Sequence, residues 1–263
     1  MADAVLKPME VAIAAALAAG HALMQAYGQA HEVRAKESWR DLVSGADLAA
    51  EACAIEVVLG HQPHARIVSE ERGDLGQAQT DAHWVIDALD GSVNYLHQLP
   101  WFAVSIAFVQ QGQVQAASIY APLSKDLYYA SRGQGAFKND RRLRVADLPS
   151  AQSLFAATFS GQTLESARRP QEYLAFGQVN DASRGCLRTG SAALNLAYLA
   201  EGKLNGCWGK ASRHWDVMAG LLLAQEAGAC TEVLAHDEAG RCSFIAAPPA
   251  NFQFLSQHVR GCF

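Results

Sequence analysis

The chain has 263 residues, of which 50% are hydrophobic and 18% are charged, and its formal net charge is −5. A chain of this length can bury a large core, either as one domain or as two closely packed ones. Its slightly acidic balance and its lack of a basic block exclude a surface built mainly to hold nucleic acid or an anionic membrane.

The N-terminal part of the chain predicts two helices, at residues 8–28 and at roughly 46–60. The first is rich in alanine and begins at Pro8, and its apolar part, Val11–Met24, is shorter than a bilayer span. It also lacks the basic start and the cleavage site of a signal peptide. We therefore expect a cytoplasmic protein without a membrane partner.

Strands are predicted next. Ala65–Val68 and Trp84–Ile86 are short strand candidates that each run into acidic residues. From Phe102 to Val145, β-branched and aromatic runs alternate with the turn-rich segments QQGQ, PLSK and RGQG. This alternation is typical of an antiparallel meander.

After Pro149, helices and strands alternate again. The predicted elements are a strand at 154–159, helices at Gly190–Glu201 and Trp215–Ala227, a strand at Phe244–Ala247 and a closing helix. We place a soft boundary here. Residues 1–148 form an N-terminal α+β part and residues 149–263 a C-terminal α/β part, packed as one compact unit of mixed layers.

The six cysteines are widely spaced, with no CxxC pair and no paired histidine spacing. This pattern argues against a zinc site and against a disulfide framework, so buried free thiols are the expected state. The residues are Cys53, Cys186, Cys207, Cys230, Cys242 and Cys262.

The segment WVIDALDGS places Asp87 and Asp90 between an apolar run and a tight turn. Buried charges need a partner or a metal, and two carboxylates brought to one point repel unless a cation lies between them. Oxygen ligands without histidine or cysteine favour Mg²⁺ over zinc.

Other acidic residues have a structural alternative. Asp47 could cap a helix, Asp216 could be a favourable charge at a helix N-terminus, and the Glu70-Glu71 pair could be a solvated turn. Next to Asp90, Gly91 and Ser92 would let the backbone approach a ligand and, if a short helix follows, offer free N–H groups to a phosphate. Metal ligands beside a phosphate cradle indicate phosphoryl transfer.

Three motifs together resemble the signature of the inositol monophosphatase family, the lithium-sensitive, Mg²⁺-dependent phosphatases. They are Glu70-Glu71, DALDGS at 87–92 and WDVMAG at 215–220. Further segments occur in the same order as in that family, so that the resemblance covers roughly residues 34–250. These segments are Lys36 followed by DLVSGAD at 41–47, GQGAFKND at 133–140 and LRTGSAALNLAYLAEGKLNG at 187–206.

The resemblance implies a set of metal ligands for two Mg²⁺ ions, or three when a weaker site is filled. The first ion would be held by Glu70, Asp87, the Leu89 carbonyl and Asp90. The second would be held by Asp87, Asp90 and Asp216, and Glu70 would contribute to the third. The second ion would steady the leaving alkoxide and would be the position at which lithium inhibits.

The resemblance also implies the substrate contacts and the catalytic groups. The amides of Gly91 and Ser92 would bind the phosphate of a small phosphorylated substrate. The Ser92 hydroxyl, oriented by Asp47, would act with Glu70 to activate a water for in-line attack on phosphorus. The substrate ring would contact Gly190, Ser191 and Ala192.

The sequence departs from the common family pattern at several positions. Ala88 stands where proline is usual, and Ser92 where threonine is usual. Gly209 replaces a glutamate that binds substrate hydroxyls in inositol-selective members, and the cations Lys210 and Arg213 lie beside it. We assign Lys210 to substrate binding, which would admit a more anionic substrate; the alternative is that both cations are solvated surface charges.

The resemblance implies a layered fold, the α-β-α-β-α five-layer sandwich of the sugar phosphatases, and a homodimer. The leading function is hydrolysis of a sugar or inositol phosphate. The alternatives within the fold are histidinol-phosphate, fructose-1,6-bisphosphate and 3′-phosphoadenosine-5′-phosphate phosphatases. The non-enzymatic alternative is a protein that binds the transcription machinery; nucleic acid itself is not an expected partner.

Overall fold

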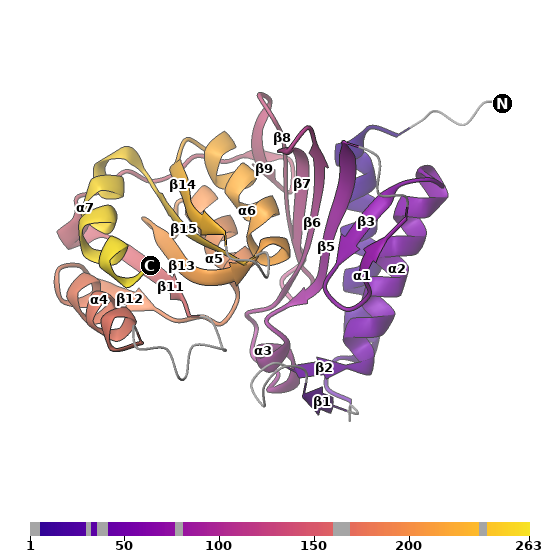
Figure 1. Cartoon of the computed structure of the whole chain (residues 1–263), viewed down its shortest axis with the longest axis horizontal. Coiled ribbons are helices and arrows are strands. Elements are labelled where there is room, and N and C mark those ends of the chain that lie inside the picture. Colours follow the sequence, from indigo (N-terminus) through magenta and orange to yellow (C-terminus); the bar gives the residue numbers. More distant parts are fainter. Residues whose placement is uncertain (1–5, 30–32, 36–41, 77–80, 160–168, 237–240) are drawn as a thin grey trace.

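Five layers follow one another along the longest axis of the molecule: helices, a sheet, helices, a second sheet and helices (Figure 1). The structure is a computed structural model that describes residues 6–29, 33–35, 42–76, 81–159, 169–236 and 241–263. The arrangement confirms the predicted α-β-α-β-α sandwich. Lys36 and Asp41 of the predicted motifs lie outside the described residues.

The first sheet has eight strands in the order β10-β9-β8-β7-β6-β5-β3-β4. Strands β5 to β10 are consecutive antiparallel neighbours, which confirms the predicted meander, whereas β3 pairs with β5 in parallel. The strands are β3 (Arg66–Ser69), β4 (Gly73–Leu75), β5 (Ala82–Asp90), β6 (Ala103–Gln110), β7 (Gln113–Ala121), β8 (Asp126–Ser131), β9 (Gly135–Lys138) and β10 (Arg141–Arg142). A separate small pair joins β1 (Val33–Ala35) and β2 (Leu42–Ser44).

The second sheet has five strands in the order β12-β11-β13-β15-β14. The strands are β11 (Leu154–Thr158), β12 (Gly185–Leu187), β13 (Cys207–Arg213), β14 (Cys230–His236) and β15 (Arg241–Ala247). Strands β12, β13 and β14 were not predicted from the sequence. In β13 the segment CWGKASR contains a glycine and two cations and does not alternate between apolar and polar residues. The predicted division at 148/149 falls between the strands of the two sheets.

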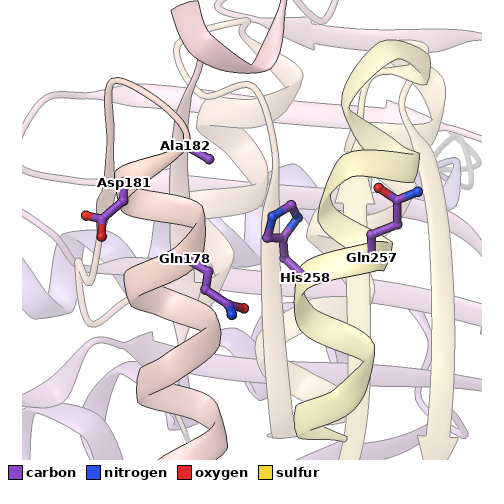
Figure 2. Close-up of a pocket in the computed structure, with 5 residues that line it drawn as sticks. All are labelled: Gln178, Asp181, Ala182, Gln257 and His258. Atoms are coloured by element: carbon purple, nitrogen blue, oxygen red, sulfur yellow. The ribbon is translucent and has the colours of Figure 1, made fainter.

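Helices α4 (Arg169–Asp181) and α7 (Pro249–Val259) form the outer layer over the second sheet. The sequence analysis missed α4 and predicted α7 only as a closing helix. A pocket of about 680 Å³ opens between these two helices (Figure 2). Its lining residues are Gln178, Asp181, Ala182, Gln257 and His258. It contains none of the predicted site residues.

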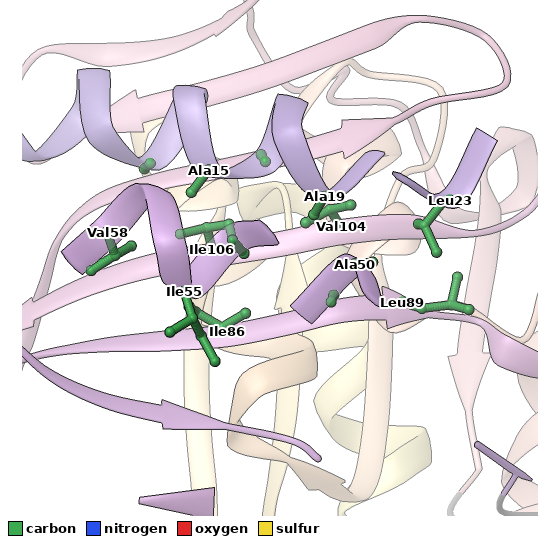
Figure 3. Close-up of a cluster of buried hydrophobic side chains, with 14 of the residues drawn as sticks. Ala15, Ala19, Leu23, Ala50, Ile55, Val58, Ile86, Leu89, Val104 and Ile106 are labelled. Carbon is green, nitrogen blue, oxygen red and sulfur yellow. The ribbon is translucent and has the colours of Figure 1, made fainter. Parts of the chain in front are cut away.

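Helices α1 (Pro8–Ala26) and α2 (Gly45–His61) form the outer layer over the first sheet (Figure 3). With 19 residues and a mean hydropathy of 1.3, α1 is long and apolar enough to cross a membrane, so the expectation that it is too short is wrong. However, Ala15, Ala19 and Leu23 are fully buried against α2 and the sheet. Because its apolar face packs in the core, α1 is a core helix.

Helices α5 (Ala192–Ala200) and α6 (His214–Glu226) form the middle layer between the two sheets. They pack on the first sheet through Leu194 and Leu223, and on the second through Leu196 and Val217. The N-termini of α5 and α6 carry predicted site residues, and the short helix α3 (Ser92–Leu96) follows β5. Single 3₁₀ turns occur at Ser150–Gln152 and Arg260–Cys262.

The cysteines differ in exposure from the prediction. Cys230 is exposed and Cys53 is half-buried, whereas the other four are buried, and all six are free thiols. The prediction of free thiols is therefore confirmed, but that of complete burial is wrong. Cys230 is exposed because it begins β14, the edge strand of the second sheet.

Candidate active site

A β-bulge at the end of β5 brings Asp87 and Asp90 to the same face of the sheet. Asp87 pairs with Ser105 of β6 and Asp90 with Ala103, so three steps along β5 match two steps along β6. In a regular strand, residues three apart point to opposite faces, and the extra residue of a bulge cancels that alternation. The two carboxylates are therefore neighbours, with Asp87 1% and Asp90 8% exposed.

Asp216 joins these two residues from the other half of the chain. It lies in the first turn of α6. Ser105, the cross-strand partner of Asp87, donates a hydrogen bond from its hydroxyl to the Trp215 carbonyl at 3.0 Å. This partly buried contact fixes the start of α6 beside the bulge. Its polar side chain inside the apolar run AVSIAFV was the only sequence signal for Ser105.

Burial and neighbouring carboxylates raise the pKa of Asp87, Asp90 and Asp216. Burial and then the charges of Glu70, Asp90 and Asp216 hold the pKa of Asp87 well above its usual range. Burial raises the pKa of Asp90 to about 6, against the hydrogen bonds that it accepts. Burial, Asp90 and Glu70 also raise the pKa of Asp216. The four predicted carboxylates thus lie within electrostatic reach of one another.

Protein donors hold the three aspartates in place. The Leu89 amide donates to Asp87 Oδ1 at 2.9 Å, and the Arg213 amide donates to Asp216 Oδ2 at 3.2 Å. Asp90 accepts hydrogen bonds from the hydroxyl of Ser191 and from the amides of Ala192 at 3.4 Å and Ala193 at 2.8 Å, all at the N-terminus of α5.

The residues fit a hard divalent cation by their chemistry. The donor set is entirely oxygen, and the charges of neighbouring carboxylates raise the pKa of Asp87 and Asp216, a repulsion that a cation would relieve. In the described ranges, however, the side chains as placed form no group of three His, Cys, Asp or Glu residues that could hold a metal ion. Binding would therefore require these carboxylates to come closer together, and Asp87 and Asp216 each accept the hydrogen bond described above at one of their two oxygens.

Gly91 and Ser92 form the turn from β5 into α3. Gly91 has φ +95°, and a Cβ there would lie 2.6 Å from the Trp101 carbonyl oxygen, so that only glycine fits. The Ser92 hydroxyl donates to the Leu89 carbonyl at 3.2 Å. Since a hydroxyl has one proton, Ser92 cannot donate to Asp47 in the same arrangement.

Asp47 lies in the first turn of α2 and is 4% exposed. Its Oδ2 accepts hydrogen bonds from the Ser44 amide at 2.9 Å and from the Ser44 hydroxyl at 2.5 Å. These hydrogen bonds to Ser44 are the contacts expected if Asp47 caps helix α2, which was the structural alternative for this residue. Asp47 also faces α3, since its charge helps to raise the pKa of Tyr95 to about 12, after burial.

The N-terminus of α5 carries the predicted ring contacts. Gly190 is exposed with φ +87°, Ser191 caps the helix by accepting the Leu194 amide, and Ala192 begins it. Asn94 of α3 donates to the carbonyls of Thr189 at 2.9 Å and Trp101 at 2.6 Å. Asn94 thus connects the turn at Gly91 and Ser92 to the start of α5. No pattern in the sequence predicted a role for Asn94.

Lys210 does not join the other predicted residues. Its ammonium lies 2.8 Å from Glu172 of α4, and the two side chains are 12% and 4% exposed. It is therefore neither a solvated surface charge nor a free cation for a substrate. Gly209 packs on the other face of β13, where a Cβ would lie 2.4 Å from the Phe244 ring. Arg213 remains close to the carboxylates, and its charge lowers the pKa of Asp216.

The chain matches the model of the inositol monophosphatase family over residues 6–259. An inositol-1-monophosphatase of Mesorhizobium japonicum is 38% identical over 224 residues, which cover 84% of this chain and 83% of that protein. A protein named Nus factor SuhB from Escherichia coli is 37% identical over 222 residues, covering 84% and 82%.

Solved structures resemble the whole fold. The extragenic suppressor protein suhB of Bartonella henselae has a TM-score of 0.85 at 31% identity, covering 96% of this chain and 98% of that chain. An inositol monophosphatase of Anabaena (Nostoc) sp. PCC 7120 has a TM-score of 0.82 at 32% identity, covering 95% and 94%.

Proposed function

The chain belongs to the inositol monophosphatase family, and from this premise we propose that it is a Mg²⁺-dependent phosphomonoesterase for a small sugar or inositol phosphate. One observation carries the proposal. Carboxylates from both halves of the chain, Asp87, Asp90 and Asp216, lie within electrostatic reach of one another beside the glycine turn that begins α3, and the charge of Asp90 raises the pKa of the other two. A buried concentration of negative charge of this kind suits a divalent cation and its phosphate ligand.

We assign the metal ligands from the family motifs and the placement of the carboxylates. They are Glu70, Asp87, the Leu89 carbonyl, Asp90 and Asp216, for two to three Mg²⁺ ions. When bound, the ions would neutralise phosphate charge and lower the pKa of a coordinated water. The N-terminal part, residues 1–148, would supply most of the ligands, and the C-terminal part, residues 149–263, would complete the site.

The chain's own groups would orient the substrate and move the proton. The amides of Gly91 and Ser92 would hold the phosphate, and Gly190, Ser191 and Ala192 would contact the ring. Glu70, half-buried at a turn, would take the proton of the attacking water, with Ser92 and Asp47 orienting that water. The new bond would join the water oxygen to phosphorus, the bond from phosphorus to the ester oxygen would break, and the departing alkoxide would take a proton from solvent water to leave as the alcohol.

Substrate selectivity would depend on Arg213 rather than on Lys210. The usual hydroxyl-binding glutamate is replaced by Gly209, and Glu172 neutralises Lys210. Arg213 is then the cation near the carboxylates, where its charge lowers the pKa of Asp216. The alternative substrates are histidinol phosphate, fructose-1,6-bisphosphate and 3′-phosphoadenosine 5′-phosphate, of which the last two carry more negative charge than an inositol monophosphate.

The deciding experiment is phosphate release from a panel of these esters and inositol 1-phosphate, with and without Mg²⁺. We expect turnover that EDTA abolishes and that added Mg²⁺ restores. A chain inactive on every ester would contradict the proposal, and a low rank for inositol phosphates would reject only the inositol substrate. Lithium should inhibit, because a monovalent ion cannot match the charge of the second Mg²⁺.

A second candidate function is binding to the transcription machinery. It is supported by the name Nus factor given to relatives that are 37% identical. A pull-down with purified RNA polymerase components, using wild type and a catalytically impaired variant, would test it. Retained binding by the impaired variant would separate this role from hydrolysis.

We also propose a homodimer in the cytoplasm, by resemblance to the family. Sedimentation equilibrium across a range of concentrations would test the oligomeric state. A monomer at micromolar concentration would reject the dimer without affecting the enzymatic proposal.

A further inference from the structure

Glu51 is a buried carboxylate on α2 that bonds to a backbone turn far away in the sequence. Its side chain is 1% exposed. Its Oε1 accepts hydrogen bonds from the amides of Glu71 at 2.9 Å and Arg72 at 3.4 Å, and its Oε2 lies 3.4 Å from Arg72 Nε. A charged acceptor makes such hydrogen bonds stronger than neutral pairs do. Glu51 therefore fastens this turn to α2.

The same turn carries Glu70. The Glu70 amide donates to the Ile86 carbonyl at 3.2 Å, directly before Asp87. The backbone of Glu70 is thus fixed to β5 on one side, and the next two residues are fixed to Glu51 on the other. The turn also closes the hairpin of β3 and β4, in which Ser69 pairs with Gly73, and Glu51 binds the two amides between these paired ends. The conformation of the turn, and with it the direction of the Glu70 side chain, therefore depends on Glu51 as well as on the strands.

We propose that Glu51 is a positioning residue, which sets the Glu70 carboxylate toward Asp87 and the other metal ligands. This inference rests on the proposed function, since it gives Glu51 a task in metal binding. Groups that orient metal ligands typically change metal affinity or activity by roughly 10–100-fold when removed. Glu51 touches neither substrate nor metal in this assignment, so it acts only through the turn.

Glu226 offers a matched control. Its carboxylate also accepts two backbone amides, from Gly133 at 2.8 Å and Gly135 at 2.7 Å. It lies at the C-terminal end of α6, whereas Asp216 lies in the first turn of that helix, so the two are separated by roughly 15 Å along the axis. Removing Glu226 would release a loop that carries no proposed ligand.

The test compares Glu51→Ala, Glu51→Gln and Glu226→Ala by Mg²⁺ titration calorimetry on the metal-free protein. We expect Glu51→Ala to weaken Mg²⁺ binding by about 10-fold or more. Glu51→Gln keeps an oxygen acceptor for the two amides and should stay within about 3-fold of wild type, and Glu226→Ala should not change the affinity. In hydrogen exchange without metal, the amides of Glu71 and Arg72 should exchange faster in Glu51→Ala.

Equal Mg²⁺ affinities for Glu51→Ala and wild type would overturn the inference, as would equal losses in Glu51→Ala and Glu226→Ala. If Glu51→Ala does not fold, Glu51→Asp takes its place, because its shorter side chain cannot reach the same amides. Wild type that binds no Mg²⁺ and hydrolyses no ester would instead overturn the proposed function. The two failures are therefore distinguishable.

Discussion

The Cα of Gly91 faces the backbone of Trp101 so closely that a Cβ at Gly91 would lie 2.6 Å from the Trp101 carbonyl oxygen. The same carbonyl accepts a hydrogen bond from Asn94 of α3. The start of α3 is thus packed against the backbone of Trp101 and Phe102. A side chain at Gly91 would have to push α3 away.

Gly91→Ala should lower both stability and activity. The residue would be strained at φ +95° and would clash with backbone, so we expect a loss of about 2 kcal/mol and, from displaced amides, a fall of ~10²-fold in kcat/KM. Gly112→Ala is the control, since Gly112 has φ +71° and open space around it. Urea denaturation and phosphate release measure the two effects. Equal losses in both variants would show that the contact with Trp101 does not matter.

Asp90→Asn should remove catalysis while leaving the fold intact. Asparagine keeps an oxygen for the amide of Ala193 but loses the charge needed to hold a cation, so we expect turnover to fall ~10³-fold or more. Asp126→Asn is the control, because Asp126 lies 3.0 Å from Lys138 at a distance from the bulge. The measurement is kcat at saturating Mg²⁺, with circular dichroism to confirm folding. A rate near that of wild type would remove Asp90 from the metal site.

The sequence indicated the meander of the first sheet well, but not the contacts through which the acidic residues of the candidate site meet. The meander and the alanine-rich α1 could be predicted because they depend on the periodicity of neighbouring residues, which can be read directly from the sequence. The bulge that turns Asp87 and Asp90 to one face depends on pairing with β6, and so does the contact of Ser105 with Trp215. Such long-range contacts leave little local signal.

Lys210 illustrates the same difficulty. Its position near Asp216 in the sequence predicted a substrate contact, but its partner Glu172 comes from α4, a helix that local pattern did not reveal. Gly209 and Lys210 follow each other in β13 and lie on opposite faces of the strand, Gly209 against Phe244 and Lys210 against Glu172. A one-residue change of register moves a side chain to the other face.

Lys210→Met should therefore reduce stability without changing substrate preference. Removing one partner of a buried ion pair leaves the charge of Glu172 uncompensated, which costs roughly 3–5 kcal/mol. Lys203→Met is the control, because Lys203 is 51% exposed in its pair with Glu201. We would measure unfolding in urea and the ratio of kcat/KM for a bisphosphate and a monophosphate. A lower ratio in Lys210→Met would restore Lys210 to the substrate site.

Glu201 should make stability depend on acid pH. Burial raises its pKa, but hydrogen bonds from Lys203 at 2.9 Å, Tyr128 at 2.8 Å and Lys138 at 3.0 Å outweigh burial and lower the pKa. A lowered folded pKa contributes stability above the unfolded pKa, about 4.3, and this contribution is lost as pH falls through the folded pKa. Glu201→Gln should thus cost about 2 kcal/mol at pH 7 and less at pH 3. Glu56→Gln, at an exposed position of α2, should cost little at either pH.

Thiol labelling should separate the cysteines into fast and slow groups. Cys230 is exposed at the start of the edge strand β14 and should react first with a disulfide reagent. Burial raises the pKa of Cys186 to about 12 and that of Cys262 to about 11, so that neither forms thiolate at pH 8. Native protein should therefore show one fast thiol that is lost in Cys230→Ser, a slower one at the half-buried Cys53, and the remaining thiols only in denaturant. A fast phase that survives in Cys230→Ser would mean that a core cysteine is open to solvent, contrary to the packing of the second sheet.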